Sequence, residues 1–173
     1  MKRYCLYLFI LIGISCSAEL KAQKNGTIYK GNDPAVRYTG RTLVSPDGSV
    51  AFDWVGTYLE TRFTGGKLSV KVSETGTSYY NVFVDGKLHK VVKVCGTDTL
   101  IHLVSGIDKR IHSLKIQKRS EGEFGKTTVH QFVLSGSGRL AEEPAVRTRH
   151  IEFIGNSLTC GYGTDGKHRD EPF

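Results

Sequence analysis

The fold is decided by residues 79–92, which read YYNVFVDGKLHKVV. Two apolar runs flank Asp85-Gly86, and this pattern predicts a β-hairpin with a type I′ turn, because both central residues of that turn need positive φ. Residues 67–73, KLSVKVS, alternate strictly and predict a further strand. Its inward residues are predicted to be Leu68, Val70 and Val72, and its outward residues Lys67, Ser69 and Lys71.

Strand patterns recur at short intervals on both sides of this hairpin. The predicted strands are residues 27–29, 36–40, 50–54, 58–63, 99–104, 113–118 and 129–134. A parallel sheet needs a crossover of roughly a dozen residues between strands, and the chain leaves no room for such connections. The sequence therefore predicts an all-β fold, an antiparallel β-sandwich over about residues 36–134.

Composition and charge fit a soluble globular chain. Of the 173 residues, 39% are hydrophobic and 24% are charged, and the formal net charge is +7. The densest basic cluster, residues 115–119, alternates with apolar residues and is interpreted as the solvent-facing side of a strand. Because no aromatic interleaving or nucleic-acid motif accompanies it, we expect no nucleic-acid partner.

Residues 1–22 indicate a signal peptide. Lys2 and Arg3 precede an apolar core, residues 4–14, which is too short to span a bilayer. We expect cleavage before Gln23, with a second possible site before Glu19. We also expect export to the periplasm or outside the cell, and no membrane span in the mature chain. Lipid attachment at Cys16 is the alternative, and it is disfavoured because Gly13 stands where a large aliphatic residue is expected.

A second region begins at residues 150–163, which read HIEFIGNSLTCGYG. Residues 150–154 predict a buried strand, Gly155 breaks it, and Ser157 follows at the turn. A strand that ends in a glycine-flanked serine is one way to expose a nucleophile, although the spacing is not G-x-S-x-G. The structural alternative is that Ser157 is simply the N-cap of a helix.

This stretch resembles the first conserved block of the SGNH (GDSL-type) esterases, in the form found in carbohydrate esterase family 2. The resemblance implies an N-terminal jelly roll, a following α/β SGNH domain, and Ser157 as the acyl-accepting nucleophile. The residues that support the nucleophile would be Gly155, Asn156, Thr159 and Gly161. Asn156 stands where many relatives have Asp, and an amide can make comparable local hydrogen bonds.

Other parts of the SGNH pattern are absent from this chain. The Gly-x-Asn-Asp block does not occur, and Asp165-x-x-His168 follows the nucleophile immediately, whereas the family places its Asp-x-x-His near the end of the domain. We therefore do not expect His168 to be the catalytic base. We expect the chain to be an N-terminal fragment of an esterase, without the catalytic His and most of the oxyanion hole.

The predicted organisation has four parts. Residues 1–22 are the signal peptide, 23–138 the β-sandwich, 139–149 a linker, and 150–173 the start of the SGNH domain. Residues 136–141, at the start of the linker region, match G-x-G-x-x-A. A dinucleotide-binding βαβ unit needs about 30 residues, and Pro144 breaks the pattern much sooner.

Few other residues are candidates for ligand binding, metal binding or a disulfide. Trp54 is a weak candidate for stacking on a sugar ring, as are Tyr58, Tyr79, Tyr80 and Phe83, although aromatic residues also fill sandwich cores. The histidines and cysteines show no metal-ligand spacing, so we expect no metal and no organic cofactor. Cys95 and Cys160 could form a disulfide, and two free thiols are the preferred prediction.

Two functions of different classes follow. The first is an exported esterase that removes O-acetyl groups from plant polysaccharides such as xylan, through an acyl-enzyme on Ser157. The alternative is a non-catalytic jelly-roll module that binds a polysaccharide. The sequence does not predict the oligomeric state.

Overall fold

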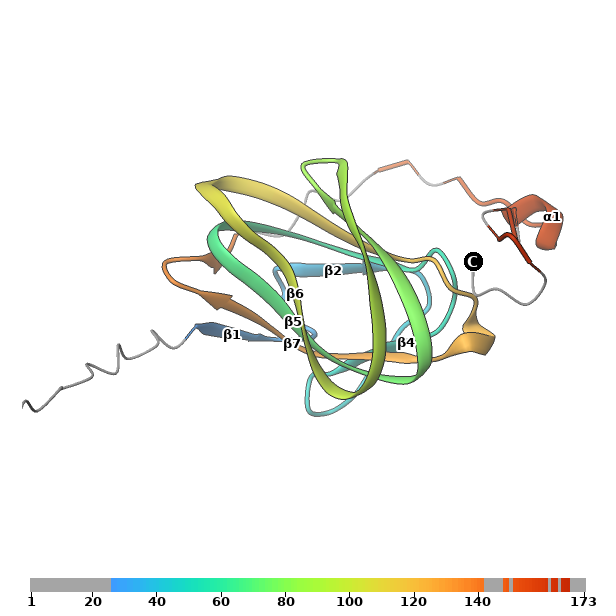
Figure 1. Cartoon of the computed structure of the whole chain (residues 1–173), viewed down its shortest axis with the longest axis horizontal. Coiled ribbons are helices and arrows are strands. Elements are labelled where there is room, and N and C mark those ends of the chain that lie inside the picture. Colours follow the sequence, from blue (N-terminus) through green and yellow to red (C-terminus); the bar gives the residue numbers. More distant parts are fainter. Residues whose placement is uncertain (1–25, 142–147, 150, 162, 165, 169–173) are drawn as a thin grey trace, which may run out of the picture.

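The computed structural model describes residues 26–141, 148–149, 151–161, 163–164 and 166–168. The predicted signal peptide, with Cys16, lies outside the described residues. The elements are β1 (Thr27–Lys30), β2 (Val36–Thr39), β3 (Leu43–Val44), β4 (Val50–Phe52), β5 (Tyr58–Val84), β6 (Lys87–Lys118), η1 (Gly122–Phe124), β7 (Thr127–Ser135), β8 (Arg139–Leu140) and α1 (Ser157–Cys160) (Figure 1).

β5 and β6 are unusually long strands, of 27 and 32 residues, and they curl around the molecule (Figure 1). Several predicted strands are therefore successive parts of one strand. Their pairing changes register at residues 64–68 and 72–77, where Gly66 has a φ of 82°. A glycine adopts this backbone without a Cβ penalty, so the chain bends there and passes from one layer to the other.

The first sheet is built around the end of β6. Residues 111–117 of β6 pair with residues 58–64 of β5, which also pair with β2. On the other side, residues 79–84 of β5 pair with the end of β6 and with residues 87–95 of the same long strand. All of these pairings are antiparallel.

The second sheet is built around β7. β1 and β4 pair with one side of β7, and residues 67–74 of β5 pair with the other. Residues 96–107 of β6 complete the sheet next to β5. The predicted all-β antiparallel sandwich, a jelly roll, is thus confirmed.

The core lies between the two sheets. Phe63, Val82 and Leu114 project into it from the first sheet, and Leu68 and Phe132 from the second, each with an exposed fraction of 1% or less. Burial of such side chains stabilises a fold by roughly 1.5–3 kcal/mol each. The predicted inward residues Leu68, Val70 and Val72 all belong to this core.

The predicted hairpin turn is present. Asp85 and Gly86 have φ of 51° and 76°, as a type I′ turn requires, and Val84 pairs with Lys87. Ser69 is 4% exposed, although it lies on the outer face as predicted. Its hydroxyl lies 2.8 Å from Nδ1 of His102 on the neighbouring strand, so the outer face is covered at this point.

The predicted strand at residues 150–154 does not form among the residues described. Residues 151–156 have no regular secondary structure, and Ile151, Phe153 and Ile154 are 79–91% exposed. A strand needs a neighbour to accept and donate its backbone hydrogen bonds, and none is present there. The predicted linker also differs, because Arg139 and Leu140 pair with Thr64 and Phe63 as β8.

Candidate functional site

Ser157 is the first residue of the helical turn α1 and belongs to an exposed segment. Asn156 precedes it with extended backbone, and its side-chain Oδ1 accepts a hydrogen bond from the Leu158 N–H at 3.1 Å. Asn156, and not Ser157, is therefore the N-cap. The alternative in which Ser157 is the N-cap residue is therefore wrong, since Ser157 is the first residue of the helical turn.

Two glycines shape the ends of this turn. Gly161 is left-handed, with φ 70° and ψ 36°, and its N–H bonds back to the carbonyl of Leu158. At the other end, a Cβ on Gly155 would collide with the Thr159 side chain. The predicted supporting residues Gly155, Asn156, Thr159 and Gly161 thus build one local structure, which presents Ser157 at the start of a helical turn.

Two of the first N–H groups of α1 already have acceptors in Asn156. Leu158 donates to the Asn156 side chain at 3.1 Å, and Thr159 donates to the Asn156 carbonyl at 3.0 Å. His168 lies in an exposed bend of the following segment.

Trp54, the weak candidate for sugar binding, lies in the turn after β4. Its side chain is 57% exposed, and the guanidinium carbon of Arg41 lies 5.6 Å from its ring centroid. The indole is accessible to a ligand, with Arg41 over its ring.

The other aromatic candidates divide between the core and the surface. Tyr80 is 2% exposed and its hydroxyl lies 2.5 Å from Oγ1 of Thr127, so Tyr80 is a core residue. Burial raises the pKa of Tyr80 above its usual range. Tyr58, Tyr79 and Phe83 are half-buried on the outer face of the first sheet.

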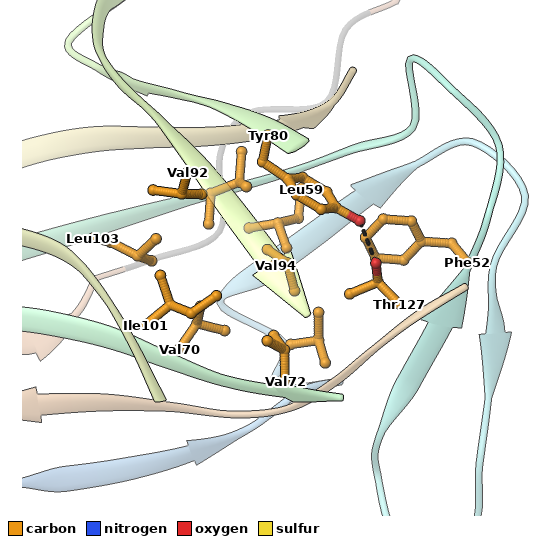
Figure 2. Close-up of a pocket in the computed structure, with 12 residues that line it drawn as sticks. Phe52, Leu59, Val70, Val72, Tyr80, Val92, Val94, Ile101, Leu103 and Thr127 are labelled. Atoms are coloured by element: carbon orange, nitrogen blue, oxygen red, sulfur yellow. Dashed lines mark hydrogen bonds between the residues drawn. The ribbon is translucent and has the colours of Figure 1, made fainter. Parts of the chain in front are cut away.

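A small cavity lies between the two sheets, but it does not resemble a substrate site. Its volume is about 20 Å³, and apolar side chains from both sheets surround it, among them Val70, Val94 and Leu103 (Figure 2). Polar side chains appear only at one end, where Tyr80 and Thr127 bond to each other (Figure 2). The cavity is a packing defect of the core.

The sequence analysis missed a polar cluster inside the sandwich. Lys118, predicted to face solvent, is 1% exposed, and its Nζ donates to Oγ of Ser78 at 2.6 Å and to the Gly125 carbonyl at 3.2 Å. Burial lowers the pKa of Lys118, and the charge of Glu74 opposes this. Glu74 in turn accepts a hydrogen bond from Thr127.

A second missed cluster joins the hairpin turn to the bend before residue 111. His112 is 3% exposed, its Nδ1 lies 2.7 Å from Asp85, and its Nε2 lies 3.0 Å from Asp108. Asp85 is the main cause of the raised pKa of His112. With a carboxylate on each ring nitrogen, both nitrogens donate when His112 is charged.

Neither a metal cluster nor a membrane-spanning helix occurs among the described residues. No three of their His, Cys, Asp and Glu side chains lie close enough together to hold a metal ion. No helix in the described ranges is long and apolar enough to cross a membrane. Cys95 is an exposed free thiol, whereas the side chain of Cys160 lies outside the description.

Comparison with known proteins connects the sandwich to a family. A family model described as carbohydrate esterase 2 N-terminal matches residues 38–144. The chain is 33% identical over 142 residues to cellulase/esterase CelE of Acetivibrio thermocellus, which covers 82% of this chain and 17% of that protein. It is 29% identical over 135 residues to an acetylxylan esterase / glucomannan deacetylase of Cellvibrio japonicus, covering 78% and 37%.

A solved structure of the same family also resembles this chain. The chain superposes on a family two carbohydrate esterase from Cellvibrio japonicus with a TM-score of 0.72 and 26% identity, and this match covers 84% of the chain and 44% of that structure. The chain therefore spans less than half the length of these relatives.

Proposed function

The chain belongs to carbohydrate esterase family 2, and from this premise we propose that it is part of an exported serine esterase that removes O-acetyl groups from plant polysaccharides. The observation that carries the proposal is the position of Ser157. It follows the family's N-terminal domain in sequence and begins a helical turn that is capped at both ends. The family's relatives include an acetylxylan esterase / glucomannan deacetylase, which supports an acetylated hemicellulose as substrate.

The proposed reaction is acyl transfer through Ser157. Its Oγ attacks the acetyl carbonyl while a histidine base takes the hydroxyl proton. The backbone N–H of Ser157 is one of the donors that stabilise the oxyanion. The sugar hydroxyl then leaves with the proton, and water attacks the acetyl-serine to release acetate. None of the described residues is assigned as the base, and the proposal places it in the remainder of the protein.

Export is part of the same proposal. The basic start and the apolar core of residues 1–22 support a signal peptide, and plant polysaccharides are too large to enter a cell. We propose that the mature chain begins at Gln23 and acts in the periplasm or outside the cell.

The test is acetate release from acetylated xylan by the complete protein that the gene encodes. Ser157→Ala is expected to lower the rate by at least about a thousandfold, because a nucleophile and its base act as one unit. Ser137→Ala is the matched control, since Ser137 is an exposed serine of the sandwich, and we expect full activity from it. Full activity of Ser157→Ala would refute the proposal.

A further inference from the structure

The outer face of the first sheet carries side chains in a regular array. One row crosses β5 and β6 in the order Tyr58, Gln117, Asn81 and Val91, each residue paired in register with the next. With strands about 4.8 Å apart, the row is roughly 14 Å long, which suits an oligosaccharide of a few residues. We call this surface the outer platform, and its other residues are Arg37, Glu60, Phe83, Lys93, Lys115, Tyr79 and Arg119.

The centre of the platform combines two amides with aromatic rings. Asn81 and Gln117 are half-buried neighbours on adjacent strands, and among the described residues neither amide side chain makes a hydrogen bond. Tyr58 lies next to Gln117, and Phe83 lies one row away. An amide can donate and accept with sugar hydroxyls, and a ring can pack against the apolar C–H face of a pyranose.

Charge on the platform is mainly positive. Lys93, Lys115 and Arg119 carry positive charge, whereas Arg37 forms an ion pair with Glu60 at 2.9 Å. Lys115 lies near the centre, with its Nζ 4.1 Å from the ring centroid of Tyr58 and 5.9 Å from that of Phe83. Asp85, beyond the end of the platform, bonds to His112. A ligand with carboxylate groups would therefore be attracted to this face.

We propose that the outer platform binds an acidic plant polysaccharide, a xylan that carries uronic acid substituents. Asn81 and Gln117 bond to sugar hydroxyls, the uronate pairs with Lys115, and the ring of Phe83 packs against the C–H face of a sugar. This site lies on the sandwich and is separate in sequence from Ser157. The inference takes from the proposed function only that the ligand is a plant polysaccharide, and it requires no catalysis.

The outer face of the second sheet provides the contrast. Lys71 pairs there with Asp98 at 3.3 Å, and the hydroxyls of Ser69 and Ser73 already bond to His102 and His130. Gln131 lies on that face and pairs with Lys71. Gln131 is therefore a glutamine on the outer face of the second sheet, as Gln117 is on the outer face of the first. The same substitution can therefore be made on both faces of one molecule.

The test measures retardation of the mature chain, residues 23–173, in gels that contain de-acetylated glucuronoxylan, with neutral arabinoxylan as the comparison. We expect tighter binding to glucuronoxylan, weakened by salt. Gln117→Glu should weaken binding about fivefold, because one surface charge contact has roughly that effect. Lys115→Gln should act similarly, whereas Gln131→Glu should bind like the parent.

Several outcomes would overturn the proposal. The first two are equal affinity for both xylans and no retardation in either gel. The third is an equal loss of affinity for glucuronoxylan in Gln117→Glu and Gln131→Glu. The fourth is a dimer of the parent in light scattering that Gln117→Glu dissociates. Circular dichroism of each variant establishes whether it is folded. If Gln117→Glu does not fold, Lys115→Gln is the variant that tests the proposal. Because the ligand carries no acetyl groups, a negative result here leaves the esterase proposal standing, and an inactive esterase leaves this result standing.

Discussion

The β-sandwich and the segment that carries Ser157 contain similar apolar residues in very different environments. Phe132 in β7 is fully buried, whereas Phe153, four residues before Ser157, is 82% exposed. Both lie in stretches whose pattern predicts a strand, yet only β7 is one. The difference is the presence of neighbours, because β7 pairs on both sides with β1, β4 and β5.

The comparison separates local from non-local structure. The turn at Ser157 forms because Asn156, Thr159 and Gly161 lie within a few residues of one another. A strand, in contrast, depends on partners that are distant in sequence. The conformation of the nucleophile turn is therefore determined by neighbouring residues. Residues 151–154, in contrast, have no strand partner among the described residues.

The largest expected difference between the two regions is in the free energy of unfolding when one phenyl ring is removed from each. Phe132→Ala is expected to lower the free energy of unfolding by about 3–5 kcal/mol, because it leaves a cavity in the core. Phe153→Ala should change it by less than about 0.5 kcal/mol, as exposed positions do. Urea unfolding of both variants measures the two values. Equal losses would mean that Phe153 packs as well as Phe132.

A smaller effect is expected at His112, which ties two turns of the sandwich together. Its pKa is raised, so the stabilisation is complete below its ordinary value of 6.5 and is lost as pH rises through the higher folded value. The pKa values of Asp85 and Asp108 are lowered, that of Asp108 to about 2, so their contribution is lost as pH falls below 3.8. The sandwich should be most stable between these limits.

The variant His112→Gln tests this directly. It should lower the free energy of unfolding by about 1–3 kcal/mol at mildly acidic pH, because an amide serves only one of the two carboxylates. Its stability should also vary less with pH from neutral to alkaline than that of the parent. Thermal unfolding across pH measures both, and His89→Gln, at an exposed position, is the control. Parallel pH profiles in the parent and in His112→Gln would contradict the role of His112.

The smallest effect concerns the cap of the nucleophile turn. Asn156→Ala should weaken the turn by roughly 0.5–2 kcal/mol and remove the protection of the Leu158 amide from hydrogen exchange. Global unfolding should change by less than about 0.5 kcal/mol, since the turn lies outside the sandwich. Asn156→Asp retains the acceptor oxygen and should preserve the protection. A global loss in Asn156→Ala would show that the two regions are coupled.

Sequence patterns identified most of the strands but not how they join. The Asp85-Gly86 turn was predictable because a type I′ turn depends on the positive φ of its two central residues, which Asp-Gly favours. The continuity of β5 through residues 64–77 was not, because glycines there can end a strand or bend it. Lys118 was predictable in principle, since period-two alternation places it on the same face as Leu114 and Ile116.

The sequence alone determined the all-β class, the type I′ hairpin, the family block and the local form of the Ser157 turn, because each depends on residues close together in the chain. Tertiary structure alone decided which partners Lys118 and His112 bind in the interior, and that Tyr58, Asn81 and Gln117 form one row. Those residues come from strands far apart in sequence, and only the pairing of β5 with β6 brings them together.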